Sequence, residues 1–388
     1  MDLIPQIRQE HAALTAIRQD IHAHPEIGFQ ETRTAALVAD CLRRWGVDRV
    51  ETGIGKTGVV GVIEGRGPGR TIGLRADMDA LPMEEDTGLP FTSRNPGAFH
   101  GCGHDGHTTM LLGAAQYLAA TRSFPGRVTL IFQPAEERLT GADAMLADGL
   151  FDRFPCDEVY GLHNWPGKPA GWIGCTPGVS MAASNSFDIA ITGRGSHGAM
   201  PNQSIDPVMV AVTMAQALQT VVSRNVPPRQ MAVLSVTSVH AGSAYNVVPE
   251  TASLRGTIRS YDKAVHTLII RRIQEIAAGI AATFGATATV TINPGCTPLA
   301  NDPTLAGTAC GIAAELVGSE NVEPAADPVS GSEDFAAMLE RVPGAHLWVG
   351  AGDGKNLHNP GYRFNDDILP IGASLLARIA ERRLASNQ

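Results

Sequence analysis

The chain has 388 residues, of which 44% are hydrophobic and 18% are charged. This length is enough for two domains, and the apolar fraction excludes a disordered or fibrous protein. The chain has 30 lysines and arginines against 39 aspartates and glutamates, so its net charge of −9 argues against binding of nucleic acid or an anionic membrane. The 12 histidines stand out beside 5% aromatic residues, because histidine is the commonest metal ligand and proton shuttle.

The N-terminal segment is polar and charged, without the apolar core of a signal peptide, and no run of about 18 apolar residues follows. We therefore expect no membrane span. The six cysteines show no paired spacing, which is typical of reduced thiols in a cytoplasmic protein. Five of them are expected to be small core residues, whereas Cys102 lies in a motif with other potential metal ligands.

The first 180 residues alternate between segments with helical periodicity and short apolar runs. The expected helices cover 5–23, 31–45 and 108–120. The expected strands cover 58–63, 71–74, 128–132 and 159–162. This alternation predicts an α/β sheet with helices on both faces.

The middle of the chain has a different order of elements. It predicts a strand at 186–192, a helix capped by Asp206 that runs to about Val222, strands near 231–240 and 251–259, a helix from Asp262 to Gly285, and a strand at 286–292. The order β-α-β-β-α-β is that of a ferredoxin-like sandwich.

Past Asn293 the first pattern resumes, with a helix near 303–317, a strand at 345–349 and a closing helix from about Ile368. The middle unit is therefore predicted to be inserted into the first. We expect one discontinuous domain of residues 1–184 and 294–388, and a second domain of residues 185–293.

Side chains able to bind a metal or transfer a proton follow the predicted strands, where sites form in open α/β sheets. These side chains are Asp77 and Asp79, Glu136 and Glu137, His163, and His358, and the segment His100–His107 precedes a helix. Any one of them is most simply a cap or a solvated group; for the two glutamates, compensation of a helix dipole is the ordinary explanation. Their coincidence at one edge predicts a site.

Cys102 and His104, two residues apart and flanked by glycines, can converge on one ion. Five donors are available: Cys102, His104, Glu137, His163 and His358. Asp77 is either a sixth donor or a partner that supports a ligand. Sulfur, nitrogen and oxygen donors suit Zn, Mn, Co or Ni and do not suit Mg or Ca. Five donors suit two divalent ions with a bridging ligand, which leaves Glu136 as a general base.

Nine segments together resemble the M20 metallopeptidases, in particular the amidohydrolase branch of hippurate hydrolases, N-acyl-amino-acid amidohydrolases and auxin-conjugate hydrolases. The segments are Arg18–His22 with Glu26 and Glu31, Arg75–Pro82, His100–His107, Gln133–Glu137, Gly161–His163, Gly193–Pro201, Asn246–Pro249, Gly331–Phe335 and Leu357–Pro360. The resemblance implies a catalytic mixed α/β sheet domain with an inserted, smaller, ferredoxin-like α+β lid or dimerisation domain.

The resemblance also implies roles for single residues. The five donors would bind two divalent ions with Cys102 as the bridge, Glu136 would be the general base, and Asp79 would orient the site. Many members carry His-x-Asp where this chain has Asp77-Met-Asp79. This departure leaves open whether Asp77 is a ligand, since Cys102 can take over that task.

Three residues of the inserted segment are further candidates. His197 resembles the lid histidine that reaches the active site of the partner subunit, and Asn246 resembles a lid residue that contacts the substrate. Arg259 lies on a strand face that is usually solvated, yet its guanidinium is able to hold a substrate carboxylate with two hydrogen bonds. We expect a homodimer built on strands of this lid domain.

The expected reaction is metal-dependent hydrolysis of the amide bond of a small N-acyl amino acid, with hippurate-like or N-acetyl substrates. Metallo-aminopeptidase or dipeptidase activity of the same family is an alternative. A cysteine hydrolase with Cys102 as nucleophile and His104 or His107 as base is a further one. A metal-dependent binding protein without catalysis is the last, and Glu136 argues against it because a binder needs no base beside its ligand.

Overall fold

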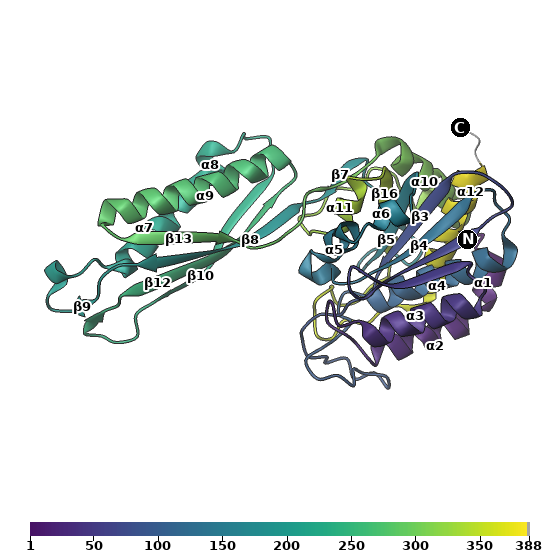
Figure 1. The fold of residues 1–388 in the computed structure, drawn as a ribbon, viewed down its shortest axis with the longest axis horizontal. Coiled ribbons are helices and arrows are strands. Elements are labelled where there is room, and N and C mark those ends of the chain that lie inside the picture. The colour runs from purple at the N-terminus through teal and green to yellow at the C-terminus, as the bar shows by residue number, and fades with distance from the viewer. Residues whose placement is uncertain (386–388) are drawn as a thin grey trace. The chain divides into compact units, whose positions relative to one another are not determined.

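The computed structural model describes residues 1–385 and divides into two compact units (Figure 1). The large unit comprises Met1–Ser180, Ala300–Pro328 and the chain from Asp334 onward, and the small unit comprises Met181–Leu299 and Val329–Glu333. In the part of the chain that the structure describes, no helix is both long and apolar enough to cross a membrane.

An eight-stranded sheet forms the centre of the large unit, in the order β1-β2-β4-β3-β5-β16-β6-β15. The strands are β1 (Arg49–Ile54), β2 (Gly58–Glu64), β3 (Thr71–Asp77), β4 (Arg127–Gln133), β5 (Glu158–Trp165), β6 (Ile173–Gly174), β15 (Val322–Glu323) and β16 (Gly344–Gly350). Strands β4, β3, β5 and β16 are mutually parallel, so their carboxyl ends meet at one edge. Their residues are almost all buried, which explains why they read as continuous apolar runs.

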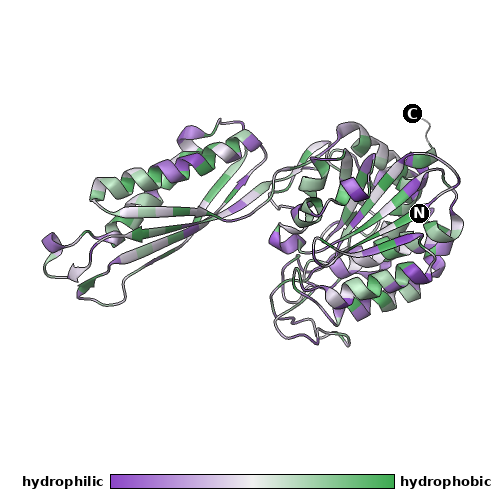
Figure 2. Cartoon of the chain, viewed as in Figure 1, coloured by the Kyte–Doolittle hydropathy of each residue, from purple (hydrophilic) through white to green (hydrophobic). Residues whose placement is uncertain are grey.

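Helices cover both faces of this sheet, as predicted. They are α1 (Pro5–Gln9), α2 (His11–His22), α3 (Thr32–Arg44), α4 (His104–Thr121), α5 (Gly141–Ala147), α6 (Leu150–Arg153), α10 (Pro303–Val317), α11 (Phe335–Leu339) and α12 (Leu369–Ala385). Helices α4 and α12 pack together on one face, and α11 packs on β5 from the other (Figure 1). Figure 2 shows the central strands between them as largely hydrophobic.

The small unit has the predicted β-α-β-β-α-β order. Its elements are β8 (Ala183–Thr192), α7 (Pro207–Leu218), α8 (Thr220–Asn225), β10 (Ala232–Ala241), β12 (Thr251–Ser260), α9 (Lys263–Phe284) and β13 (Thr287–Ile292). The strands form an antiparallel sheet in the order β10-β12-β8-β13. The carboxylates of Asp206 and Asp262 cap α7 and α9, and Gly285 ends α9 with a φ of +75°.

Some expected boundaries are wrong. The predicted helix over 5–23 is two helices that meet at Glu10, and the helix from Pro207 pauses at Gln219 before α8. Helix α4 begins at His104 and not at residue 108, because Gly103 turns the chain into the helix with a φ of +95°. His104 and His107 therefore lie in the first turn of α4. Strand β1 was not predicted because most of its residues are polar or exposed.

Candidate metal centre

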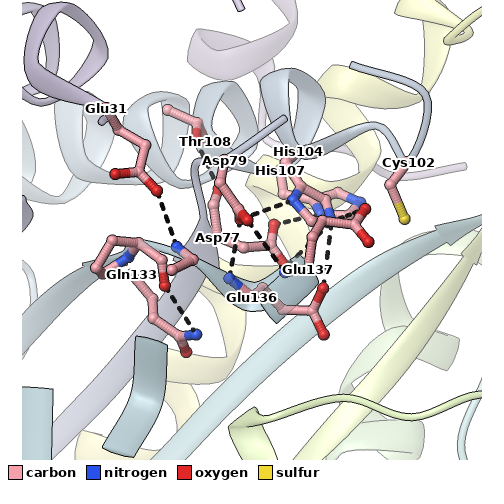
Figure 3. Close-up of polar contacts among 12 residues, drawn as sticks. Glu31, Asp77, Asp79, Cys102, His104, His107, Thr108, Gln133, Glu136 and Glu137 are labelled. Atoms are coloured by element: carbon pink, nitrogen blue, oxygen red, sulfur yellow. Dashed lines mark hydrogen bonds and ion pairs between the residues drawn. The ribbon is translucent and has the colours of Figure 1, made fainter. Parts of the chain in front are cut away.

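The candidate ligands come from segments that meet at the carboxyl edge of β4, β3, β5 and β16. Strand β5 carries His163, and the loop after β16 carries His358. Strand β4 leads into a short 3-10 helix, η1 (Glu136–Arg138), which presents Glu137. Cys102 lies just before α4, and His104 is the first residue of that helix (Figure 3).

The structure brings these side chains into two groups that share one sulfur. Ligand atoms of Cys102, His104 and His163 lie within 4.8 Å of one another, and so do those of Cys102, Glu137 and His358. The Cys102 Sγ lies 3.4 Å from His163 Nε2, and Glu137 Oε1 lies 3.5 Å from His358 Nε2. The five predicted donors therefore converge, with the thiol between the two groups.

Two of the donor atoms have no hydrogen-bond partner. Among the described residues, His104 Nε2 and Glu137 Oε1 are both buried and make no hydrogen bond. A buried polar atom left without a partner costs about 1–3 kcal/mol. The two atoms lie 3.9 Å apart, so a cation between them would satisfy both. The residues present thus fit a divalent transition metal ion.

The charge balance also calls for a cation. Burial lowers the pKa of His104, but the charges of Asp77, Asp79 and Glu137 raise it to about 10. Burial and the charges of Glu137 and Glu136 raise the pKa of the Cys102 thiol well above its usual range. The surplus negative charge is therefore offset either by protons on His104 and Cys102 or by a metal ion. A metal ion would favour the neutral imidazole and the thiolate.

Asp79 contacts three residues of the site. Its two oxygens accept the backbone N–H groups of Glu136 and Glu137, each at 3.0 Å, and one of them lies 3.2 Å from His104 Nδ1 (Figure 3). In the neutral imidazole that a metal ion would require, a hydrogen bond from Nδ1–H to Asp79 leaves Nε2 unprotonated and aimed into the site. One carboxylate therefore fixes both glutamates and the tautomer of a ligand histidine.

Both oxygens of Asp77 are engaged away from the ligands. They lie 2.9 Å from Arg75 Nη1 and 2.6 Å from His107 Nδ1, whereas His104 Nε2 is 3.8 Å away. Burial opposes ionisation, but the charges of His104, His107 and Arg75 hold the pKa of Asp77 well below its usual range. His107 continues the network, with Nε2 at 2.6 Å from Asn164 Oδ1.

Backbone strain is concentrated beside the ligands. Ala135 has a φ of +53° directly before the two glutamates, and His358 has a φ of +63°. Such conformations cost about 1–3 kcal/mol and persist only where the surroundings impose them. Fully buried Glu31 accepts the Ala135 N–H at 2.9 Å and the hydroxyl proton of Thr57 at 2.5 Å. No role was predicted for Glu31, although it lies in one of the segments that resemble M20 enzymes.

The remaining candidates, His197, Asn246 and Arg259, belong to the small unit. His197 in β9 (Ser196–His197) pairs with Val247 in β11 (Val247–Val248), directly after Asn246. Both His197 and Asn246 are exposed. Arg259 lies at the far end of β12 from β11, half-buried, and donates to the carbonyl of Ile258 at 2.8 Å. The structure therefore brings His197 and Asn246 together but not Arg259.

Residues 73–382 match peptidase family M20/M25/M40. The chain belongs to this family. It is 41% identical over 384 residues to hippurate hydrolase of Campylobacter jejuni, covering 99% of this chain and 100% of that protein. It is 38% identical over 371 residues to N-acetylcysteine deacetylase of Bacillus subtilis, covering 95% and 96%.

A solved structure from Bacillus subtilis, the YxeP protein, has a TM-score of 0.83 and 34% identity, with 97% of this chain and 99% of that chain covered. That protein is described as a dinuclear metal binding peptidase from the M20 family. This M20 member is accordingly a metal-dependent amidohydrolase with a catalytic α/β domain and an inserted ferredoxin-like domain. The predicted family and fold class are confirmed.

Proposed function

We propose that this M20 member hydrolyses the amide bond of N-acyl amino acids, releasing a carboxylate and a free amino acid. The observation that carries the proposal is the pair of donor groups joined at Cys102, with a further glutamate, Glu136, beside them. Two divalent ions, Zn, Mn, Co or Ni, would be held by these groups. When bound, the ions lower the pKa of a water molecule and polarise the acyl carbonyl.

Glu136 is the proposed general base. It is 5% exposed, its backbone is held by Asp79, and its Oε2 lies 3.9 Å from His104 Nε2. The neighbouring Glu137 lies equally far from His104 Nε2 but also contacts His358 Nε2 at 3.5 Å. The carboxylate of Glu136 would take a proton from the attacking water and return it to the leaving amine nitrogen. Asp79 and Asp77 would keep the ligands and this base in place.

The inserted domain would complete the site. In this proposal residues 185–293 form the lid and residues 1–184 with 294–388 the catalytic domain. His197 would stabilise the oxyanion and contact the substrate with Asn246, and Arg259 would bind the substrate carboxylate. We propose a homodimer through the lid, supported by the exposed apolar residues on α7 and β10. These are Met209 (51% exposed), Val212 (44%) and Val239 (46%).

The names of the relatives suggest which acyl groups to test first. Hippurate carries an aromatic acyl group and N-acetylcysteine a small aliphatic one. A panel of N-benzoyl and N-acetyl amino acids, assayed after reconstitution with each of the four metals, would define the acyl group and the metal. Unblocked dipeptides in the same panel test the aminopeptidase or dipeptidase alternative.

The decisive variant is Glu136→Gln, with metal content measured. Loss of general acid–base catalysis should lower kcat by about 10²–10⁴-fold at unchanged metal content. Glu84→Gln, which changes an exposed glutamate, is the matched control. Near-normal turnover in a fully metallated Glu136→Gln enzyme would exclude this role.

One contact favours a second candidate function. The Cys102 Sγ, 3.4 Å from His163 Nε2, has the geometry of a cysteine–histidine pair. A cysteine hydrolase would keep its activity in the presence of a chelator. The metal proposal predicts that the chelator abolishes activity and that an added divalent ion restores it. The surrounding carboxylates oppose a metal-free thiolate, which supports the metal proposal.

A further inference from the structure

A buried imidazole lies between two carboxylates near the metal centre. His22, at the end of α2, is 0% exposed. Its Nδ1 lies 2.8 Å from Asp105 Oδ2, and its Nε2 lies 3.3 Å from Glu85 Oε1. Asp105 directly follows the candidate ligand His104 and also contacts Arg18 Nη1 at 3.3 Å. One side of His22 is therefore tied to the helix that carries a ligand.

The other side of His22 is tied to a loop that Glu85 organises. The Glu85 carboxylate accepts the backbone N–H of Ser93 at 2.6 Å and the hydroxyl hydrogen of Thr87. The Glu85 carboxylate thus connects two other positions of the loop 85–93, and its contact with His22 connects this loop to α2.

This loop is in turn fastened to the segment that carries His358. The Asp86 N–H donates to the Pro360 carbonyl at 2.7 Å, and the Arg363 guanidinium donates to the Thr87 carbonyl. The two contacts hold the segment 360–363 at its first and last residues. All four residues belong to the large unit.

His358 depends on such backbone support. Its side chain is 54% exposed, so packing around the ring does not fix it. Its backbone has a φ of +63°, and its N–H donates to the Gly101 carbonyl at 2.8 Å. A strained and exposed ligand keeps its place only if the segments on both sides are held. The His22–Glu85 contact holds one of them.

We propose that His22 and Glu85 are positioning residues that hold His358 in register with His104, and so set the affinity of the ion on the His358 side. This inference rests on the two-ion site of the proposed function. His22 lies between a carboxylate next to one ligand and a carboxylate that anchors the loop of another. Groups that orient metal ligands typically change metal affinity by about 10–100-fold when they are removed.

The charge of His22 supports this placement. Burial lowers the pKa of its imidazole, but the hydrogen bonds to Asp105 and Glu85 raise it to about 9. At neutral pH the ring therefore carries a proton on each nitrogen and donates to both carboxylates. A charge-assisted hydrogen bond on each side is about twice as strong as a neutral one.

The test measures metal affinity and not turnover. The parent chain, Glu85→Gln, His22→Gln and the neighbouring control Glu84→Gln are stripped of metal and dialysed against graded free Zn²⁺ or Mn²⁺, and bound metal is measured by mass spectrometry. In Glu85→Gln one ion should bind at least tenfold more weakly while the other stays within twofold of the parent. Glu84→Gln should bind like the parent. His24→Gln, two residues beyond the end of the same helix, is the control for His22→Gln.

The split between the two ions separates positioning from general damage. Unchanged affinities in Glu85→Gln, or equal weakening of both ions, would overturn the inference. Where Glu85→Gln does not fold, Arg363→Gln removes the contact to Thr87 from the exposed side and should give the same split. A parent chain that binds fewer than two ions would instead contradict the proposed function.

Discussion

The two groups of predicted site residues are held in very different ways. At the sheet edge of the large unit, His104 and Asp77 are fully buried, and each hydrogen bonds to a second buried side chain. On the β9–β11 ribbon of the small unit, His197 and Asn246 are exposed. His197 makes one side-chain hydrogen bond, accepting the N–H of Ala199 at 3.0 Å. The side chains of the first group are therefore held in place without substrate, whereas few contacts hold those of the second group.

This difference fits two separate tasks. Metal ligands need fixed geometry, because a supporting group that is lost weakens binding of the ion. A side chain that stabilises an oxyanion acts only when the reacting atoms are present. Variants of the first group should therefore change metal content and activity together. Variants of the second group should change activity alone.

His197→Ala should show the largest effect on activity of the variants that leave the metal ligands and the base untouched. Loss of one oxyanion donor typically lowers kcat by about 10²–10³-fold. Metal content should stay at the parental value and thermal unfolding should change little, because the ring is exposed and the N–H that it accepts belongs to Ala199, two residues away. Measurement of both kcat and bound metal in this variant tests whether the two groups of residues have separate tasks. Lower metal content in His197→Ala would contradict it.

The same variant tests whether the site is shared between chains. Mixed dimers of His197→Ala and Glu136→Gln chains should recover part of the activity if His197 acts in the partner's site. Purified heterodimers without recovered activity would show that His197 acts on its own chain, or not at all.

Asp79→Asn should have the next largest effect. The amide would place an N–H group against one of the two backbone donors of Glu136 and Glu137, and it would weaken the bond to His104. Metal affinity should fall by about 10–100-fold, and activity with it. Excess metal should restore part of the activity. Asp86→Asn, on an exposed residue, is the control. Parental metal affinity in Asp79→Asn would show that Asp79 does not orient the ligands.

Local signals predicted much of the fold. The caps at Asp206 and Asp262 depend on residues two or three positions away, so the starts of α7 and α9 followed from the sequence. Repeated periodicity predicted the β-α-β-β-α-β order. The break at Glu10 could not be predicted, since neither proline nor glycine marks it and the apolar pattern continues from α1 into α2.

The candidate donors were also predictable, because Glu137, His163 and His358 lie in or after strands, Cys102 and His104 lie at the start of a helix, and their types are chemically distinctive. Their supports were not. His22 and Glu85 are 63 residues apart in the chain, and His22 and Asp105 are 83 apart, so only the folded chain shows that they meet. His22 lies near the end of the helix predicted over 5–23, and this position identifies neither of its two partners. Glu85 lies in a polar loop with no pattern that distinguishes it from Glu84.

The last expected effect concerns stability and pH and does not involve activity. His22 faces Asp105, Glu85, Arg18 and the ring of His100. Its pKa is about 9 in the folded chain and about 6.5 when unfolded. A raised pKa in the folded state gives stability that is complete below pH about 6.5 and is lost as the pH rises through about 9.

Urea unfolding of the metal-free protein at several pH values measures this effect. Between pH about 6.5 and 9, the parent should lose up to about 3 kcal/mol of its free energy of unfolding relative to His22→Gln. Comparison with His22→Gln removes the contribution of other groups that titrate in this range, cysteines included. Parallel pH profiles would mean that His22 is not charged at neutral pH. The buried ring would then connect the segments of His104 and His358 through neutral hydrogen bonds alone. These bonds are weaker than charge-assisted ones, so the buried group of site residues would be held less firmly.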